Sequence, residues 1–244
     1  MQRKGISQEG LKLIACLSML IDHIGATVVL WALRNGATAQ QVDFYYTLRI
    51  IGRISFPIYC FLLVEGAYHT RNPKKYALRL FIGMLLSEIP FDLAFNGGAF
   101  VWNSNSVMIT LLLGFGMIQC MMHLPGFWRI AVVFPFYMLA EWMYTDYAGL
   151  GILVIAVLAL TRDRKYEKLL RLAGLWLVLG TGTPDYLLGN LLIPLESFAL
   201  LAVIPIFFYD GRKLTTNKTV QWVFYLFYPV HLLVLWMLGS LLYG

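Results

Sequence analysis

Apolar residues form long runs along the chain, and short polar connections separate these runs. A helix needs about 20 apolar residues to cross the hydrocarbon core of a bilayer. Nine segments fit this requirement: 9–33, 44–68, 76–96, 105–123, 127–144, 147–161, 168–183, 186–208 and 218–242. The pattern predicts an all-α fold, a polytopic membrane bundle of about nine transmembrane helices that forms one domain over residues 1–244.

The composition supports a membrane protein. Hydrophobic residues make up 59% of the chain and charged residues 13%, whereas a soluble domain carries about 25% charged residues. The lipid bilayer is therefore the expected surroundings. The net charge of +6 then indicates orientation in the membrane rather than binding to nucleic acid.

The three cysteines, Cys16, Cys60 and Cys120, lie in apolar runs and have no CxxC or Cys/His spacing. We expect them to be buried small hydrophobic residues. Neither a disulfide nor a metal site is expected from them.

Lysine and arginine alternate between the predicted connections. They gather before the first helix and in the even-numbered connections, while the odd-numbered connections contain only Arg34. Connections on the cytoplasmic side of a membrane carry an excess of Lys and Arg. The alternation predicts a cytoplasmic N-terminus, a C-terminus outside, and an odd number of spans.

Ionisable residues occur inside the predicted helices, where each is costly and usually functional. The first helix carries Asp22 and His23, the second Arg49 and Arg53, and the last His231. Acidic residues follow elsewhere: Glu88, Asp92, Glu141, Asp146 and Glu196. The predicted orientation brings these groups to one level in the outer half, which indicates a polar cavity that opens outward.

Asp22 and His23 point about 100° apart on a helix, so Asp22 is poorly placed to orient His23. We expect Asp22 to pair with Arg49 or Arg53, which are one helical turn apart. His23 is then available as a general base, and the arginines can stabilise developing negative charge. The structural alternative is an inert histidine beside an ion pair, with the arginines reaching the outer interface.

Glu88, Asp92 and Glu141 form the acidic side of the predicted cavity. They could orient an amine or hydroxyl acceptor, or they could only balance the charge of the two arginines. His231 follows Pro229, which interrupts the helical hydrogen bonds. A histidine in this position is either a structural hydrogen-bonding group or part of the substrate site.

The inner end of the second and third helices is rich in polar residues: Glu65, His69, Arg71, Lys74, Lys75 and Arg79. These residues either only set the orientation, or they bind a polyanionic cytoplasmic cofactor, since clustered cations suit phosphates. The chain contains no Walker loop and no GxGxxG motif, so direct use of a nucleoside triphosphate is not supported.

Successive blocks of the chain resemble the TraX family, which is named for a conjugative pilin acetylation protein. The blocks include LKLIACLSMLIDHIG, LRIIGRISFPIYCFLLVEGAYHTRNPKKYALRL, LSEIPFDLAF and YLFYPVHLLVL. They follow in order over nearly the whole chain. The family is similar to the wider group of membrane acyltransferases that includes acyltransferase family 3 and heparan glucosaminide acetyltransferase.

The resemblance implies a multi-pass acetyltransferase of the bacterial cytoplasmic membrane, an acyltransferase-like domain over residues 1–244. Acetyl-CoA would enter from the cytoplasm, and the acceptor would be a protein N-terminus, another amine or a glycan hydroxyl. His23 would be the base or a transient acyl acceptor, with Arg49 and Arg53 beside the acetyl group or the phosphates. His231 would be a second functional histidine.

Two other functions use the same residues. A proton-coupled transporter also needs intramembrane Asp, Glu, His and Arg, although the two halves show no matching pair of interrupted helices. A non-catalytic assembly factor would tolerate the loss of His23.

Overall fold

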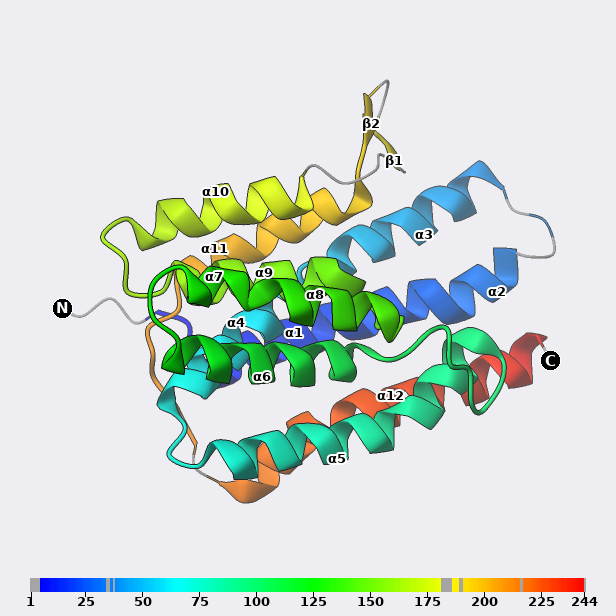
Figure 1. Cartoon of the computed structure of the whole chain (residues 1–244). Helices are drawn as coiled ribbons and strands as arrows, with labels where there is room; N and C mark the ends of the chain where they lie inside the picture. Colours follow the sequence, from blue (N-terminus) through cyan, green and yellow to red (C-terminus); the bar gives the residue numbers. More distant parts are fainter. Residues whose placement is uncertain are drawn as a thin grey trace.

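A computed structural model of the chain describes residues 5–33, 36, 38–180, 186–188, 191–215 and 217–243. The helices lie roughly side by side, with α5 and α12 along one edge and α10 and α11 along the opposite edge (Figure 1). Arg34, which the orientation argument uses, lies outside the described residues. So do residues 181–183 and 189–190 of the predicted seventh and eighth segments.

The first three predicted segments each form an interrupted helix. Their parts are α1 (Gln8–Ile24), the π-helix η1 (Gly25–Val29), α2 (Leu30–Leu33), α3 (Ala39–Gly52), α4 (Ser55–His69), α5 (Pro73–Phe91) and the π-helix η2 (Asp92–Asn96). The later helices are α6 (Val107–His123), α7 (Trp128–Ala131), α8 (Val133–Trp142), α9 (Ala148–Leu160), α10 (Glu167–Leu179), the 3₁₀-helix η3 (Leu195–Ala202), α11 (Val203–Phe207) and α12 (Lys218–Tyr243).

Within the part of the chain that the structure describes, three helical stretches are long and apolar enough to cross a bilayer: Gln8–Leu33, Ala39–His69 and Thr219–Leu242. Shorter apolar helices pack beside them: Val107–His123, Ala148–Leu160 and Leu195–Phe207. Large hydrophobic side chains cover much of the outer surface, for example Leu85, Phe134 and Trp176. Exposed apolar surface of this extent is expected where lipid replaces water, and the chain is a membrane protein.

The prediction of a helix from residue 186 was wrong. Strands β1 (Tyr186–Leu188) and β2 (Leu191–Ile193) pair antiparallel, and Tyr186 lies opposite Ile193. The sequence between the strands is Gly-Asn, a composition typical of tight hairpin turns. Pro194 follows, and the residue before a proline favours extended backbone, so helical structure begins only at Leu195.

The main hydrophobic core lies around α4, α6 and α9. Its fully buried side chains include Ile58, Met117 and Ile155. Helix α9 is apolar on all sides, as expected for a helix surrounded by others. Cys16 and Cys60 are buried as predicted, but Cys120 is exposed, because it lies near the end of α6 on a side that no other helix covers.

The residues before α1 are tied to the connection between α11 and α12. The Ile6 amide donates to the Phe208 carbonyl at 2.7 Å, and the Asp210 amide donates to the Ile6 carbonyl at 3.1 Å. The Glu9 carboxylate accepts from the Leu214 amide at 2.8 Å. Segments about 200 residues apart in the sequence therefore meet at one end of the molecule.

Gly52 ends α3 where the second predicted segment is interrupted. A Cβ atom at this position would lie 2.1 Å from the Cβ of Asp22 on α1. Real carbon atoms do not approach so closely without displacement, so the contact between α1 and α3 requires glycine.

Gly52→Ala should lower the free energy of unfolding by about 1–3 kcal/mol, because the added methyl group overpacks the contact with Asp22. Thermal unfolding of the detergent-purified protein would measure the loss as a lower midpoint. Gly98→Ala is the matched control, because its Cβ would meet nothing closer than 3.6 Å. Equal midpoints for the two variants would contradict this account of the helix contact.

Candidate functional site

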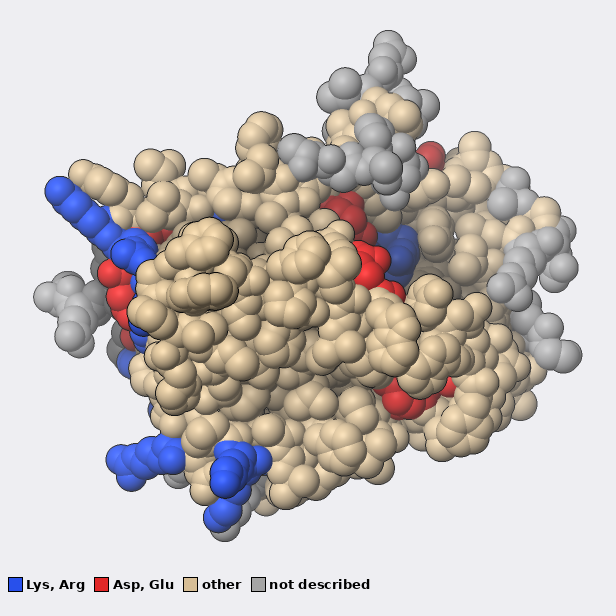
Figure 2. Space-filling model, in the orientation of Figure 1, with Lys and Arg blue, Asp and Glu red and all other residues tan. Residues whose placement is uncertain are grey.

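A cavity of about 340 Å³ lies between α1, α3, α4 and the connection from α8 to α9. Its polar lining includes Asp22, His23, Arg49, Arg53 and Asp146. In Figure 2, acidic and basic side chains lie next to one another at a recess of the face shown, away from the end where most of the Lys and Arg side chains lie. The predicted polar cavity is therefore present, and it contains Asp22, His23, Arg49 and Arg53 of the first two predicted segments.

Four charged side chains form an alternating chain across the cavity. Arg49 Nη1 lies 2.7 Å from Asp22 Oδ2, and Arg53 Nη2 lies 2.8 Å from Asp22 Oδ1. Arg53 Nη1 also lies 2.7 Å from Glu196 Oε1. The predicted pairing of Asp22 is confirmed for both arginines, and the two cations and two carboxylates neutralise one another.

His23 meets the second intramembrane histidine. His23 Nδ1 lies 2.7 Å from His231 Nε2, and His231 Nδ1 lies 2.6 Å from the Phe227 carbonyl. His231 is buried and stands behind His23, which alone of the two lines the cavity.

Interruptions of regular helix position these groups. The π-helix η1 begins two residues after His23, and the Thr27 hydroxyl donates to the His23 carbonyl at 2.5 Å. Arg53 caps α3 at the interruption before α4, and Pro229 precedes His231 within α12. π-Helical turns and prolines redirect side chains and are frequent at functional sites. Of these interruptions, the sequence predicts only Pro229.

The connection between α8 and α9 is a strained corner. Tyr144, Tyr147 and Ala148 have positive φ angles of 49°, 63° and 40°, which are costly for residues other than glycine. Asn105 holds the corner through its backbone. Its backbone N–H donates to the Tyr144 carbonyl at 2.9 Å, and its backbone carbonyl accepts from the Asp146 N–H at 2.8 Å.

This corner presents Asp146 to the cavity. Thr110 Oγ1 donates to the Asp146 carbonyl at 2.6 Å, but within the described part of the chain no hydrogen bond or ion pair engages the Asp146 carboxylate. Solvent reaches it through the cavity, yet the enclosing protein desolvates it and raises its pKa to about 6, while Arg53 opposes the shift. Sequence reasoning placed Asp146 at the same outer level as the other charges but gave it no role in the site, because no pattern indicates a corner with positive φ.

A second cavity of about 240 Å³ adjoins the first. Its charged lining consists of Lys12, Arg79 and Lys213. The two cavities share apolar and tyrosine side chains: Met19, Tyr59, Val107, Leu111 and Tyr228. These five side chains therefore lie between the cationic cavity and the one that contains His23.

The predicted cofactor residues divide into three groups. Arg79 lines the second cavity, but Arg71, Lys74 and Lys75 are exposed at the start of α5 and do not line it. Sequence reasoning missed Lys12 and Lys213, which lie far apart in the chain.

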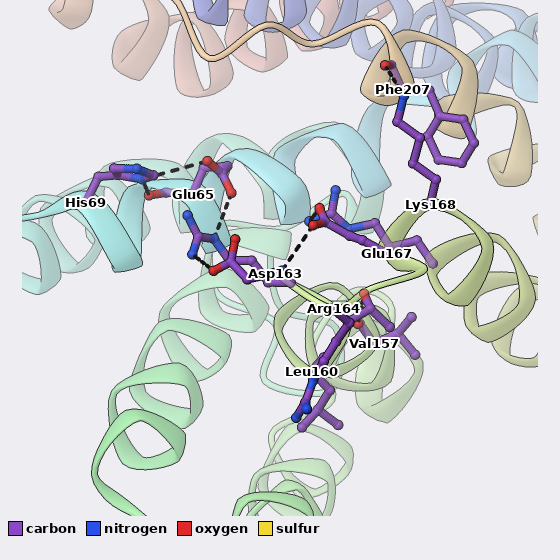
Figure 3. Close-up of polar contacts among 12 residues, drawn as sticks. Glu65, His69, Val157, Leu160, Asp163, Arg164, Glu167, Lys168 and Phe207 are labelled. Atoms are coloured by element: carbon purple, nitrogen blue, oxygen red, sulfur yellow. Dashed lines mark hydrogen bonds and ion pairs between the residues drawn. The ribbon is translucent and has the colours of Figure 1, made fainter.

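Glu65 and His69 lie elsewhere, near the connection from α9 to α10 (Figure 3). Arg162 Nε donates to Glu65 Oε1 at 3.0 Å, and His69 Nδ1 donates to the Glu65 carbonyl at 2.8 Å. Neither residue lines the second cavity. The ion pair between Glu65 and Arg162 joins the end of α4 to this connection.

The predicted acceptor residues also lie outside the first cavity. Glu88 accepts from Ser106 Oγ at 2.5 Å, and Asp92 accepts from the Val101 amide at 2.9 Å. Glu141 accepts from a backbone amide at the start of α9 at 3.1 Å. These carboxylates hold connections between helices.

Comparisons with known proteins cover nearly the whole chain. The family model described as "TraX protein" matches residues 7–239. The chain is 31% identical to the "Probable fimbrial assembly protein FimC, serogroup H1" of Dichelobacter nodosus, over 92% of each chain. It is 27% identical to the "Uncharacterized protein RP591" of Rickettsia prowazekii (strain Madrid E), over 81% of this chain and 71% of the relative.

No solved structure matches the chain. The family match extends over all the residues that line the two cavities and includes both intramembrane histidines. The chain therefore belongs to the TraX family.

Proposed function

We propose that this protein is an acetyltransferase that moves an acetyl group from cytoplasmic acetyl-CoA to an amine or hydroxyl acceptor. One observation carries the proposal: a cationic cavity and a cavity with a histidine, arginines and carboxylates share a wall of five side chains. A donor bound in the cationic cavity would need to pass only this wall to reach His23.

The proposal includes nine spans in the bacterial cytoplasmic membrane, with the N-terminus in the cytoplasm. Lysine and arginine gather at one end of the molecule (Figure 2). This end carries the α4–α5 and α9–α10 connections (Figure 1). An end of this kind belongs on the cytoplasmic side, where acetyl-CoA is available.

The cationic cavity suits the phosphates of CoA. None of its three cations has an ion-pair partner within the described ranges, and Lys12 and Arg79 lie over the rings of Phe224 and Tyr76. Unpaired cations at a cavity attract phosphate groups. The remaining lining is largely aromatic and aliphatic, as the adenine and the pantetheine arm require.

The first cavity has the groups for acyl transfer. The acceptor nitrogen or oxygen attacks the thioester carbonyl, the carbon–sulfur bond breaks, and CoA leaves. His23 accepts a proton from the neutral amine or hydroxyl and passes it to the CoA sulfur, which leaves as the thiol. Arg49 and Arg53 stabilise the oxyanion, and Arg49 Nε is a buried donor without an acceptor among the described residues.

The charge of the cavity favours an amine acceptor. The Arg49–Asp22–Arg53–Glu196 chain is neutral, so Asp146 leaves one negative charge uncompensated. An ammonium group on the acceptor would neutralise the Asp146 carboxylate. After acetylation this group is a neutral amide, so the product is no longer attracted to the carboxylate. The name of the Dichelobacter nodosus relative, a probable fimbrial assembly protein, supports the α-amino group of a pilin subunit as acceptor.

Calorimetry with acetyl-CoA and the detergent-purified protein tests the donor site. Replacing Lys12, Arg79 and Lys213 by Gln should weaken binding at least about 100-fold, or about 2.7 kcal/mol, because the phosphates lose their cations. Replacing Arg71, Lys74 and Lys75 by Gln is the charge-matched control and should change the affinity little. If the folded wild-type protein does not bind acetyl-CoA, the result would favour the proton-coupled transporter over the acetyltransferase.

His23→Ala should lower acetyl transfer at least about 100-fold, the contribution typical of a general base, while acetyl-CoA still binds. Release of CoA thiol in the presence of a short synthetic peptide with a free α-amino group would measure the rate. Undiminished transfer in the variant would remove His23 from the mechanism.

Asp146→Asn should raise the KM for the peptide about 10-fold or more, because a charge-assisted hydrogen bond contributes about 1.5–3 kcal/mol. Glu141→Gln serves as control, since this carboxylate lies near the same corner but outside the cavity. The affinity of the wild-type protein for the peptide should also decrease as the pH is lowered through about 6, because Asp146 becomes protonated. Asp146→Asn should abolish this pH dependence. Equal KM values for the two variants would exclude Asp146 from acceptor binding.

A further inference from the structure

The rings of His23 and His231 meet edge to edge. Their planes differ by only 4°, and their centroids are 5.0 Å apart. Rings stacked face to face would bring the centroids nearly as close as the contacting nitrogens, which are 2.7 Å apart. The two rings therefore lie nearly in one plane, which aligns the N–H of one ring with the lone pair of the other.

Hydrogen-bonding rules determine the direction of this contact. A carbonyl oxygen only accepts, so His231 Nδ1, 2.6 Å from the Phe227 carbonyl, carries a hydrogen. A neutral imidazole has one N–H, which leaves His231 Nε2 as an acceptor. His23 Nδ1 must then be the donor, and His23 Nε2 carries a lone pair. No hydrogen bond to this Nε2 is found among the described residues, and His23, unlike His231, lines the cavity.

We infer that His231 is a positioning residue that holds His23 in the tautomer with a hydrogen on Nδ1, so that the unprotonated Nε2 faces the cavity. The inference rests on the proposed function, because the tautomer matters only if His23 accepts a proton. Imidazole in water favours the opposite tautomer, with the hydrogen on Nε2. That tautomer would present a donor to the acceptor substrate and could not serve as a base.

A neutral partner suits this position. Many catalytic histidines are oriented by a carboxylate that accepts from Nδ1, but Asp22 already shares its oxygens between Arg49 and Arg53. His231 supplies the acceptor without adding another charge to the site. When His23 takes up a proton, the Nδ1 hydrogen can move to His231 Nε2, which carries the positive charge away from the two arginines.

Aromatic neighbours limit rotation of both rings. Phe95 and Tyr228 contact His23 edge-on at centroid distances of 5.3 and 6.1 Å. Phe227 stacks on His231 at 4.7 Å with planes 16° apart. Both rings are therefore held in the orientation that the hydrogen bonds from His23 to His231 and from His231 to the Phe227 carbonyl require.

Nitrogen-15 NMR of the histidine-labelled, full-length protein tests the tautomer without any acceptor. The chain has four histidines, and a single-site substitution assigns each ring. His23 should show a protonated Nδ1 and a bare Nε2 at neutral pH. It should revert to a protonated Nε2 in His231→Leu and keep its tautomer in His231→Gln, whose amide oxygen can replace the acceptor. A protonated Nε2 on wild-type His23, or an unchanged tautomer in His231→Leu, would overturn the inference.

Transfer to the peptide gives the second measurement. His231→Leu should lower the rate of transfer at least about 100-fold relative to the wild-type protein. His231→Gln should lower it only about 10-fold, and acetyl-CoA binding should be unchanged in both variants. Equal losses in the two variants would overturn the positioning role. Absence of transfer by the wild-type protein would instead count against the proposed function, and the NMR result would still decide the tautomer.

Discussion

The Asp22 carboxylate, shared between Arg49 and Arg53, is the interaction on which the rest of the site depends. Unpaired charges inside a membrane are costly, and removing one member of a buried pair typically costs about 3–5 kcal/mol. Two arginines one helical turn apart can reach a single carboxylate only if the helices approach closely. The glycine at position 52 and the interruption between α3 and α4 provide that approach.

The pairing of the arginines with carboxylates also makes the first cavity different from the second. The arginines in the first cavity are neutralised by protein carboxylates, so they can polarise a carbonyl without holding phosphates tightly. The cations of the second cavity have no such partners among the described residues, and they are free to bind an anionic ligand. Differences in pairing, rather than in residue type, therefore distinguish the two cavities.

Much of this organisation was predictable from the sequence. Long apolar runs predict most of the helices, and intramembrane charges one turn apart predict the Asp22–arginine contact because helical geometry relates these residues locally. The β-hairpin was missed because its apolar strands fit a helix equally well by hydrophobicity. Lys12 and Lys213 were missed because backbone pairing between distant segments brings them together. Asp146 was placed at the right level but given no role, because its position at the cavity depends on a strained corner held by Asn105.

The last helix supplies parts of both cavities. Tyr228 lines each of them, and His231 contacts His23 from the same helix. The segment just before this helix is bonded to the residues that precede α1. A chain emerging from the ribosome therefore cannot complete either cavity until helix α12 has entered the membrane. Two cavities that begin with residues of α1 thus wait, during synthesis, for a helix that follows about 200 residues later.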